Sequence, residues 1–191
     1  MGQIPRREGD GPGRLEERKT MAILPIRHYP DDVLRKQVPL EKEIDQRLID
    51  LAGDMAETMY AAPGVGLAAP QVGESRRLIV LDCNPKDSPR LITAVNPEII
   101  LRDGECYEEE GCLSVPGYYS QVTRSSRIKV RFLDLKGKEV TLDCAGLLAV
   151  CFQHEIDHLD GVLFIDHLSS LKKSMFRRKY KKLQAQQEER M

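Results

Sequence analysis

Two histidines and a glutamate lie close together in residues 153–158 (QHEIDH), and these residue types can form a metal-dependent hydrolase site. On an α-helix, residues i and i+4 lie on the same face, so His154 and His158 could bind one ion together. Glu155 directly follows the first histidine and is placed to hold or deprotonate a water beside that ion. Two protein ligands leave a divalent ion unsaturated, so a third ligand must come from another part of the chain.

The same spacing also arises by chance, on helices that carry two surface histidines without a function. The neighbouring sequence favours a functional pair, because Leu147, Val150 and Cys151 continue the same helical stripe. The pattern predicts an apolar, buried helix that Gly161 ends. Buried imidazoles without partners are costly, and a metal ion is the simplest partner for both rings.

The third ligand is best sought among the cysteines. One zinc-protease pattern places a third histidine six residues after the second, but Phe164 occupies that position and His167 comes three residues later. A second pattern uses a glutamate from a following helix, where the candidates here lie in a very polar tail. Of the five cysteines, Cys112 differs, because it follows a charged stretch and a glycine in residues 110–117 (EGCLSVPG). The other four are expected to be small buried apolar residues.

A glycine-rich segment, residues 64–73 (GVGLAAPQVG), holds one polar side chain, Gln71. The segment could be a tight loop whose glycines only supply turn geometry. Alternatively, its backbone approaches a ligand and Gln71 donates its amide to a developing oxyanion. It is not a phosphate-binding loop, because the Lys-Ser/Thr ending of that motif is missing.

Three motifs in this order resemble the signature motifs of peptide deformylases: residues 64–71 (GVGLAAPQ), 110–114 (EGCLS) and 153–158 (QHEIDH). The resemblance runs over residues 21–171. It implies a hydrolase that removes the N-formyl group from the initiator methionine of nascent polypeptides and releases formate.

The resemblance also implies roles for individual residues. One divalent ion, natively Fe²⁺ and replaceable by Zn²⁺, Ni²⁺ or Co²⁺, would be held by Cys112, His154 and His158. Glu155 would act first as general base and then as general acid. The side chain of Gln71 and the backbone N–H of Leu113 would stabilise the oxyanion.

A pocket for the methionine side chain follows from the same resemblance and from the helical spacing, although its wall residues could also be ordinary core. Its expected walls are Val65, Leu147, Val150 and Cys151. The extended peptide would lie along the backbone near Gly66 and Gly111. Some family members carry an arginine after the cysteine motif that contacts the peptide, but Tyr119 stands near that place here, so no arginine is assigned.

Two other functions share part of this pattern. A metallo-endopeptidase would use the same histidines and glutamate, but the chain lacks a third histidine or glutamate at protease spacing. A noncatalytic metal-binding protein would have no need of Glu155 beside the ion.

The length and composition of the chain predict a single domain. The chain has 191 residues, 41% apolar and 31% charged, and its net charge of −1 gives no strong attraction to nucleic acid or anionic lipid. No apolar run approaches the roughly 18 residues that span a bilayer, and we expect no membrane association. An odd cysteine count without a Cys-x-x-Cys pair or an export signal predicts reduced thiols in the cytoplasm.

The periodicity predicts an α+β fold, with small antiparallel sheets packed around the buried metal-binding helix and a C-terminal helix. A helix is expected at residues 45–61, and strands at 77–82, 91–96, 98–102, 128–133 and 139–145, with a hairpin turn at Lys136-Gly137. Three regions follow: a flexible extension or upstream start at 1–20, a catalytic domain at 21–171 and a charged helix at 172–191.

The C-terminal helix, expected from residue 168 onward, carries a run of basic residues. The run consists of Lys172, Lys173, Arg177, Arg178, Lys179, Lys181 and Lys182. A solvated charged helix explains this pattern, and docking to ribosomal RNA near emerging nascent chains is the alternative.

Overall fold

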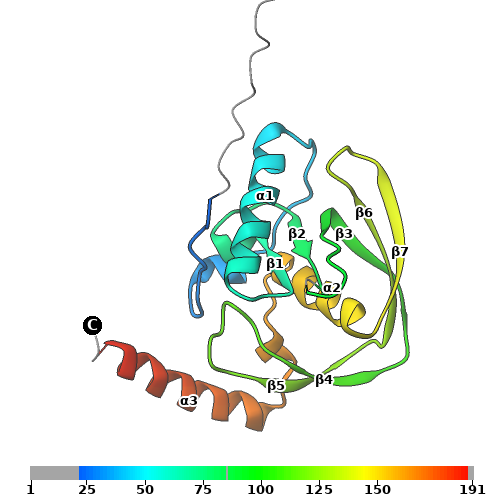
Figure 1. The fold of residues 1–191 in the computed structure, drawn as a ribbon. Helices are drawn as coiled ribbons and strands as arrows, with labels where there is room; N and C mark the ends of the chain where they lie inside the picture. Colours follow the sequence, from blue (N-terminus) through cyan, green and yellow to red (C-terminus); the bar gives the residue numbers. More distant parts are fainter. Residues whose placement is uncertain (1–21, 85, 189–191) are drawn as a thin grey trace, which may run out of the picture.

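The structure, a computed structural model, describes residues 22–84 and 86–188 (Figure 1). The predicted N-terminal extension, residues 1–20, lies outside these residues. The longer elements are α1 (Gln46–Ala61), β1 (Gly66–Ala68), β2 (Leu78–Leu81), β3 (Ile92–Asp103), β4 (Cys106–Glu110), β5 (Ser120–Arg124), β6 (Arg127–Leu133), β7 (Glu139–Ala145), α2 (Gly146–Leu159) and α3 (Ser170–Glu188). Short 3-10 turns cover Asp32–Arg35, Ala69–Val72 and Phe164–His167.

The strands form two antiparallel sheets, which confirms the predicted fold class. Five strands pair in the order β1-β2-β3-β6-β7, and β4 pairs with β5 in a separate hairpin. Figure 1 shows α2 in the middle of the molecule, with α1 beside β1 and β2, and the β4–β5 hairpin below. The predicted turn at Lys136-Gly137 joins β6 to β7, where Asp134 accepts hydrogen bonds from two backbone N–H groups.

The helix α2 is buried on nearly all sides, as expected for a helix that is apolar around most of its circumference. It follows β7 directly and packs against the sheet through Phe152, Ile156 and Leu159, together with Ile128 and Phe132 of β6. This packing holds the helix that carries both histidines against the long strands of the sheet, so the position of the helix on the sheet is fixed.

The helix α1 is capped at its N-terminus by Asp45, whose side chain accepts a hydrogen bond from the Leu48 N–H at 2.8 Å. It ends directly before the loop at residues 62–65, and its buried side, including Met55 and Met59, packs on Leu67 and Val80 of the first two strands. The helix thereby supports the glycine-rich segment from behind.

The helix α3 docks through only part of its length. Phe176 and Tyr180 are buried among Tyr29, Tyr118 and Phe164, and the Tyr180 hydroxyl donates to the backbone oxygen of Tyr29 at 3.0 Å. A basic helix was expected here and is confirmed, whereas the predicted domain boundary at residue 171 stays a prediction.

Two predicted strands, 91–96 and 98–102, form the single strand β3. The pairing of β3 with β6 shifts register between Val95 and Glu98, so Pro97 lies at an irregularity, where its missing N–H disrupts no regular ladder. Three strands escaped prediction: β1 has three residues, and β4 and β5 carry mainly polar or charged side chains. Among the helices of the described residues, none combines the length and apolar character that a membrane span requires.

Candidate metal centre

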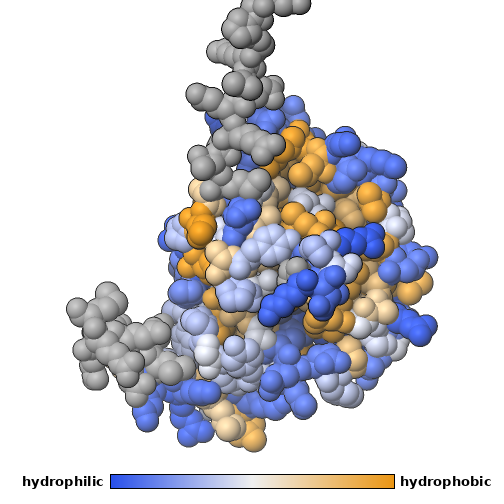
Figure 2. Space-filling model, in the orientation of Figure 1, coloured by the Kyte–Doolittle hydropathy of each residue, from blue (hydrophilic) through white to orange (hydrophobic). Residues whose placement is uncertain are grey.

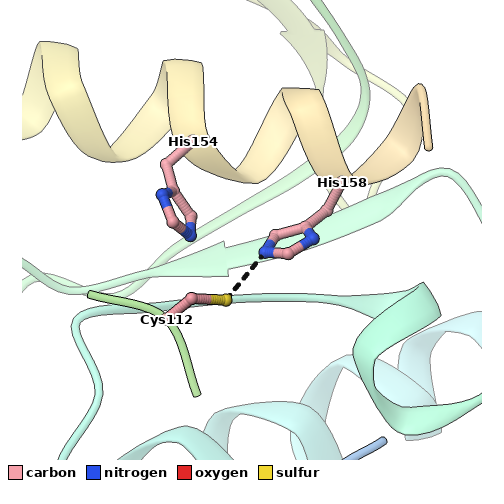
Figure 3. Close-up of side chains that lie close together, drawn as sticks. All are labelled: Cys112, His154 and His158. Carbon is pink, nitrogen blue, oxygen red and sulfur yellow. Dashed lines mark hydrogen bonds between the residues drawn. The ribbon is translucent and has the colours of Figure 1, made fainter. Parts of the chain in front are cut away.

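The two histidines of α2 and Cys112, from the segment after β4, converge on one point (Figure 3). One ligand atom from each of the three residues lies within 4.8 Å of the others, and Cys112 Sγ is 3.2 Å from His158 Nε2. Both rings leave α2 on the same side because the residues are four positions apart. The sequence-predicted trio is therefore brought together across the 41 residues that lie between Cys112 and His154, since the strands β5, β6 and β7 return the chain to this point.

The chemistry of this trio fits a divalent transition metal. A thiolate and two imidazoles are ligands that iron, zinc, nickel and cobalt accept, and their separation allows all three atoms to reach one ion. The ring of His154 has its Nδ1 2.8 Å from the Glu110 carboxylate, so Nδ1 carries the proton and Nε2 is free to coordinate. Among the described residues, the buried Nδ1 of His158 has no hydrogen-bond partner.

Behind the trio lies a buried ionic network centred on Arg124 of β5. Its guanidinium donates to both oxygens of Glu110, at 2.7 and 3.0 Å, and to Asp157 at 2.5 Å. Burial alone would raise the pKa of Glu110, but hydrogen bonds from His154 and Arg124 lower it to about 2. Glu110 is therefore a carboxylate that orients the His154 ring. The sequence motifs do not reveal Arg124, because nothing local distinguishes it from other arginines of a strand.

The amide of Gln71 is held in one orientation beside Cys112. Its oxygen accepts from the Ala68 N–H at 2.8 Å, and its Nε2 donates to Ser114 Oγ at 3.1 Å and lies 3.5 Å from Cys112 Sγ. The donor end of this amide thus faces the centre. The buried Ser114 was not singled out in the sequence, although it lies two residues after Cys112 in the same motif.

The carboxyl group of Glu155 is buried, and its Oε2 has no hydrogen-bond partner within residues 22–84 and 86–188. Burial raises the pKa of Glu155 to about 7. A Cβ on Gly66 would collide with Glu155 Oε1, so only glycine lets the β1 backbone approach this carboxyl so closely. An isolated carboxyl with a raised pKa is suited to accept a proton and later return it.

A cavity of about 460 Å³ opens beside these groups. Besides Cys112, His154, Glu155 and Gln71, it is lined by the other residues that the sequence suggested for the site: Val65, Gly66, Gly111, Leu113, Leu147, Val150 and Cys151. Its inner part is apolar, since Val150 and Cys151 are buried.

Leu147 departs from the expected buried stripe. It is 54% exposed, because it lies on the first turn of α2, where the helix leaves the sheet at the mouth of the cavity. Tyr119, which stands where an arginine was considered, also lines the cavity, and a Cβ on Gly111 would overlap its ring.

The sequence of residues 23–174 matches a model of the protein family described as Polypeptide deformylase. The chain belongs to the polypeptide deformylase family. The resemblance predicted from three motifs is therefore confirmed, and the family implies a metal at the cluster of Cys112, His154 and His158.

Individual members of the family are similar over most of their length. Peptide deformylase 1 of Burkholderia multivorans is 53% identical over 170 residues, which cover 88% of this chain and 93% of that protein. The crystal structure of a peptide deformylase from Legionella pneumophila shares 49% sequence identity, with a TM-score of 0.82 over 87% of this chain and 98% of the other. The peptide deformylase from Ehrlichia chaffeensis, crystallised in complex with actinonin, shares 38% identity with a TM-score of 0.78, over 85% of this chain and 98% of that one.

Proposed function

We propose that this chain is a metal-dependent hydrolase that removes the N-formyl group from the methionine at the start of nascent polypeptides and releases formate. Family membership supports the reaction. The observation that carries it is the meeting of three metal-ligand side chains next to the buried Glu155, whose Oε2 has no hydrogen-bond partner among the described residues, beside a cavity that Glu155, Cys112 and His154 line. Neither a purely structural metal site nor a core helix requires that carboxyl.

The proposed ligands are Cys112, His154 and His158. A divalent ion bound there would supply Lewis-acid polarisation of the formyl carbonyl and would lower the pKa of water. The carboxylate of Glu155 takes a proton from the attacking water and then delivers it to the leaving amine. The Glu110 carboxylate holds the His154 ring in its orientation throughout, through the 2.8 Å hydrogen bond.

The developing oxyanion is stabilised by two donors in this proposal. One is Gln71 Nε2. The Ala68 N–H donates to the oxygen of the same amide, which directs Nε2 toward the metal ligands. The other is the backbone N–H of Leu113, next to Cys112. Each such donor is worth about 2.7–4 kcal/mol in the transition state of a typical hydrolase.

Binding of the formylated methionine uses the apolar part of the cavity. We assign its side chain to the walls formed by Val65, Leu147, Val150 and Cys151. The backbone of the peptide lies between Gly66 and Gly111, where the absence of side chains allows a close approach.

The central experiment compares a formyl-methionyl peptide with its unformylated twin. We expect formate from the first and no cleavage of the second, whereas internal cleavage of either would favour a metallo-endopeptidase. Glu155→Gln should lower kcat by roughly 10²–10⁴-fold and leave the metal content unchanged. Full activity in that variant would contradict the assigned role of Glu155.

For the ion we propose Fe²⁺, with Zn²⁺, Ni²⁺ or Co²⁺ as functional replacements, because the thiolate and two imidazoles suit all four. Metal analysis of protein purified without oxygen, combined with formate release, tests this choice. Since bacterial nascent chains are made in the cytoplasm, we propose that the protein acts there.

A second proposal concerns the helix α3 and the ribosome. Exposed basic side chains line this helix: Lys172, Arg177, Arg178, Lys179, Lys181 and Lys182. Figure 2 shows mostly hydrophilic residues along the part of this helix drawn in colour. A positive surface of this kind suits the phosphates of ribosomal RNA.

Charge substitution tests this docking better than truncation, because removal of α3 would also delete the buried Phe176 and Tyr180. Replacing Arg177, Arg178, Lys181 and Lys182 by glutamine should weaken salt-sensitive binding to ribosomes and spare activity on small formyl peptides. Unchanged ribosome affinity would remove this proposal.

A further inference from the structure

Two cysteines from distant parts of the chain meet behind the wall of the cavity. Cys151 lies on α2, is buried and lines the cavity, one helical turn before Glu155. Cys83 is partly exposed and follows β2 by two residues. Both thiols are free, and neither belongs to the group of three metal-ligand side chains.

The course of β2 explains why these two residues meet. Ile79 and Leu81 of this strand pack in the core cluster that includes Cys151, and side chains alternate along a strand, so residue 83 is the next position on that face. The extended course continues past the strand, because the Asp82 N–H donates to the Val65 carbonyl at 2.9 Å. Cys83 accordingly packs against the same cluster as Cys151.

The two thiols differ in their ionisation. The Cys151 side chain lowers the pKa of Cys83, although burial and the carboxylates of Asp82 and Glu155 act in the opposite direction. In turn, Cys83 and burial raise the pKa of Cys151. The thiolate is the form of cysteine that reacts with peroxides, so the partly exposed Cys83 is the better nucleophile of the pair.

We propose that Cys83 and Cys151 are a redox modification site, at which a peroxide produces a reversible disulfide that alters the pocket for the methionine side chain. In a reducing compartment such a bond is transient and reports on oxidants. The effect on substrate binding rests on the proposed deformylase function, whereas formation of the bond does not.

The reaction has two steps. The Cys83 thiolate attacks one oxygen of hydrogen peroxide, the O–O bond breaks, and Cys83 becomes a sulfenic acid while the released hydroxide is protonated to water. The Cys151 sulfur then attacks the sulfur of Cys83, which forms the S–S bond and breaks the S–O bond. The departing hydroxide takes the proton of the Cys151 thiol and leaves as a second water. Two thiols are oxidised and one peroxide is reduced.

The bond changes the pocket because Cys151 is one of its walls. Cys83 is not among the described residues that line the cavity, so a disulfide draws the Cys151 sulfur away from it. The bonded sulfur atoms lie only about 2.05 Å apart, which requires the Cys151 side chain to move. A misfit of one methylene in an apolar pocket changes kcat/KM by about 10–200-fold. The ligands and Glu155 stay outside the bond, so the change should appear mainly in KM.

The first measurement detects the bond itself. Zn²⁺-loaded protein is treated with equimolar hydrogen peroxide, because zinc, unlike iron, has no redox chemistry of its own. Trypsin cuts after Arg77, Lys86 and Lys138, so Cys83 and Cys151 fall on separate peptides. Mass spectrometry should find these peptides joined with the loss of two hydrogen atoms, and separate again after dithiothreitol.

The second measurement follows turnover of formyl-Met-Ala-Ser. Oxidation should lower kcat/KM by about 10-fold, mainly by raising KM, and dithiothreitol should restore it. The zinc content should stay constant, which shows that Cys112 still binds the ion.

Cys83→Ser tests the pair without changing the cavity lining. This variant should keep the activity of the reduced protein and lose both the joined peptides and the sensitivity to peroxide. Cys144→Ser is the matched control, because it removes another thiol of the same core cluster, on the same tryptic peptide as Cys151. It should retain both the disulfide and the fall in kcat/KM.

Absence of joined peptides, or a bond through Cys144 instead of Cys151, would overturn the inference. An equal loss of activity in Cys83→Ser would also overturn it, since oxidation of Cys112 would then explain the loss. A disulfide that left kcat/KM unchanged would refute the effect on the pocket. Failure of the reduced protein to release formate would instead count against the proposed function, because the bond is detected without turnover.

Discussion

At the scale of single residues, Gln71 shows how a polar side chain becomes a directed donor. Its amide is fixed at both ends, by the Ala68 N–H on the oxygen and by Ser114 Oγ on the nitrogen. A free glutamine would have to lose rotational freedom when an oxyanion forms, whereas this one has already lost it during folding. The buried pair of Gln71 and Ser114 thus prepares the site before a substrate arrives.

Replacing Gln71 by leucine should lower kcat by about 10²–10³-fold, because one oxyanion donor is lost while the cavity volume is nearly kept. Steady-state kinetics of formate release, with metal content measured in parallel, would check this. Ser114→Ala leaves the amide in place and should have a clearly smaller effect. Equal effects of the two changes would mean that Gln71 acts only by supporting Ser114.

The single-residue features that sequence could predict are those carried by local motifs. His154, Glu155 and His158 follow from helical spacing, and Cys112 from the need for one more ligand. Arg124 could not be predicted, because its importance comes from Glu110 and Asp157, which only the folded chain brings to it. The predicted burial of Leu147 was wrong for a similar reason, since a helical stripe does not reveal where the helix emerges from the core, although Leu147 does line the cavity.

At the scale of elements, Arg124 connects the β4–β5 hairpin to α2. Within residues 22–84 and 86–188 the hairpin forms a sheet of its own, so this buried ionic connection fixes the strand that precedes Cys112 relative to the histidines. A buried charge network costs desolvation energy, but it specifies one geometry.

Arg124→Ala should therefore lower the free energy of unfolding by about 3–5 kcal/mol, because the buried Glu110 and the partly buried Asp157 lose their counter-charge. Urea unfolding gives this value. The control is Arg131→Ala, which removes an exposed ion pair with Glu98 and should cost no more than about 1 kcal/mol. Similar small losses in both variants would show that the buried network is dispensable for stability.

Another link between elements joins α1 to the residue after β2. The Tyr60 hydroxyl donates to Asp82 at 2.8 Å, and partial burial together with this hydrogen bond raises the pKa of Tyr60 to about 12. The folded state thus favours the neutral phenol. Its contribution to stability is complete below about pH 10 and is lost as the pH rises toward about 12.

The stability advantage of the unchanged protein over Tyr60→Phe should therefore shrink between about pH 10 and pH 12. Urea midpoints measured in steps from about pH 8 upward would show it. Tyr107→Phe, at a side chain that is 67% exposed, removes a hydroxyl on the surface and serves as the control. If the difference in stability between the unchanged protein and Tyr60→Phe did not vary with pH, the contribution of the Tyr60–Asp82 hydrogen bond would be refuted.

Periodicity predicted the long elements well and the short ones poorly. The helices α1 and α2 and the strands β6 and β7 carry enough apolar residues to show a pattern, whereas β4 reads CYEEE and is a strand only because it pairs with β5. Since β4 precedes Cys112, the least predictable element lies beside the site.

At the scale of the whole molecule, one aromatic cluster joins the two ends of the described chain. Tyr29 packs against Phe176 and Tyr180 of α3, with ring centroids 5.4 and 5.3 Å away, and Cys112 and Tyr118 lie on the same cluster. The C-terminal helix therefore helps to support the segment that carries the cysteine ligand.

Phe176→Ala should lower the free energy of unfolding by about 3–5 kcal/mol, because a fully buried ring is removed. Met175→Ala, at the neighbouring exposed position, should change it by less than about 0.5 kcal/mol. Thermal or urea unfolding compares the two. A small loss in Phe176→Ala would show that α3 docks only loosely.

The contact between Tyr29 and Tyr180 also constrains the order in which this protein matures. Synthesis proceeds from the amino end, so a growing copy cannot complete the cluster around Tyr29 until α3 has left the exit tunnel. The cysteine side of the metal centre gains its full support only at that moment. In a protein proposed to act on nascent chains, the segment of the active site that carries Cys112 is thus completed only after α3 has been synthesised.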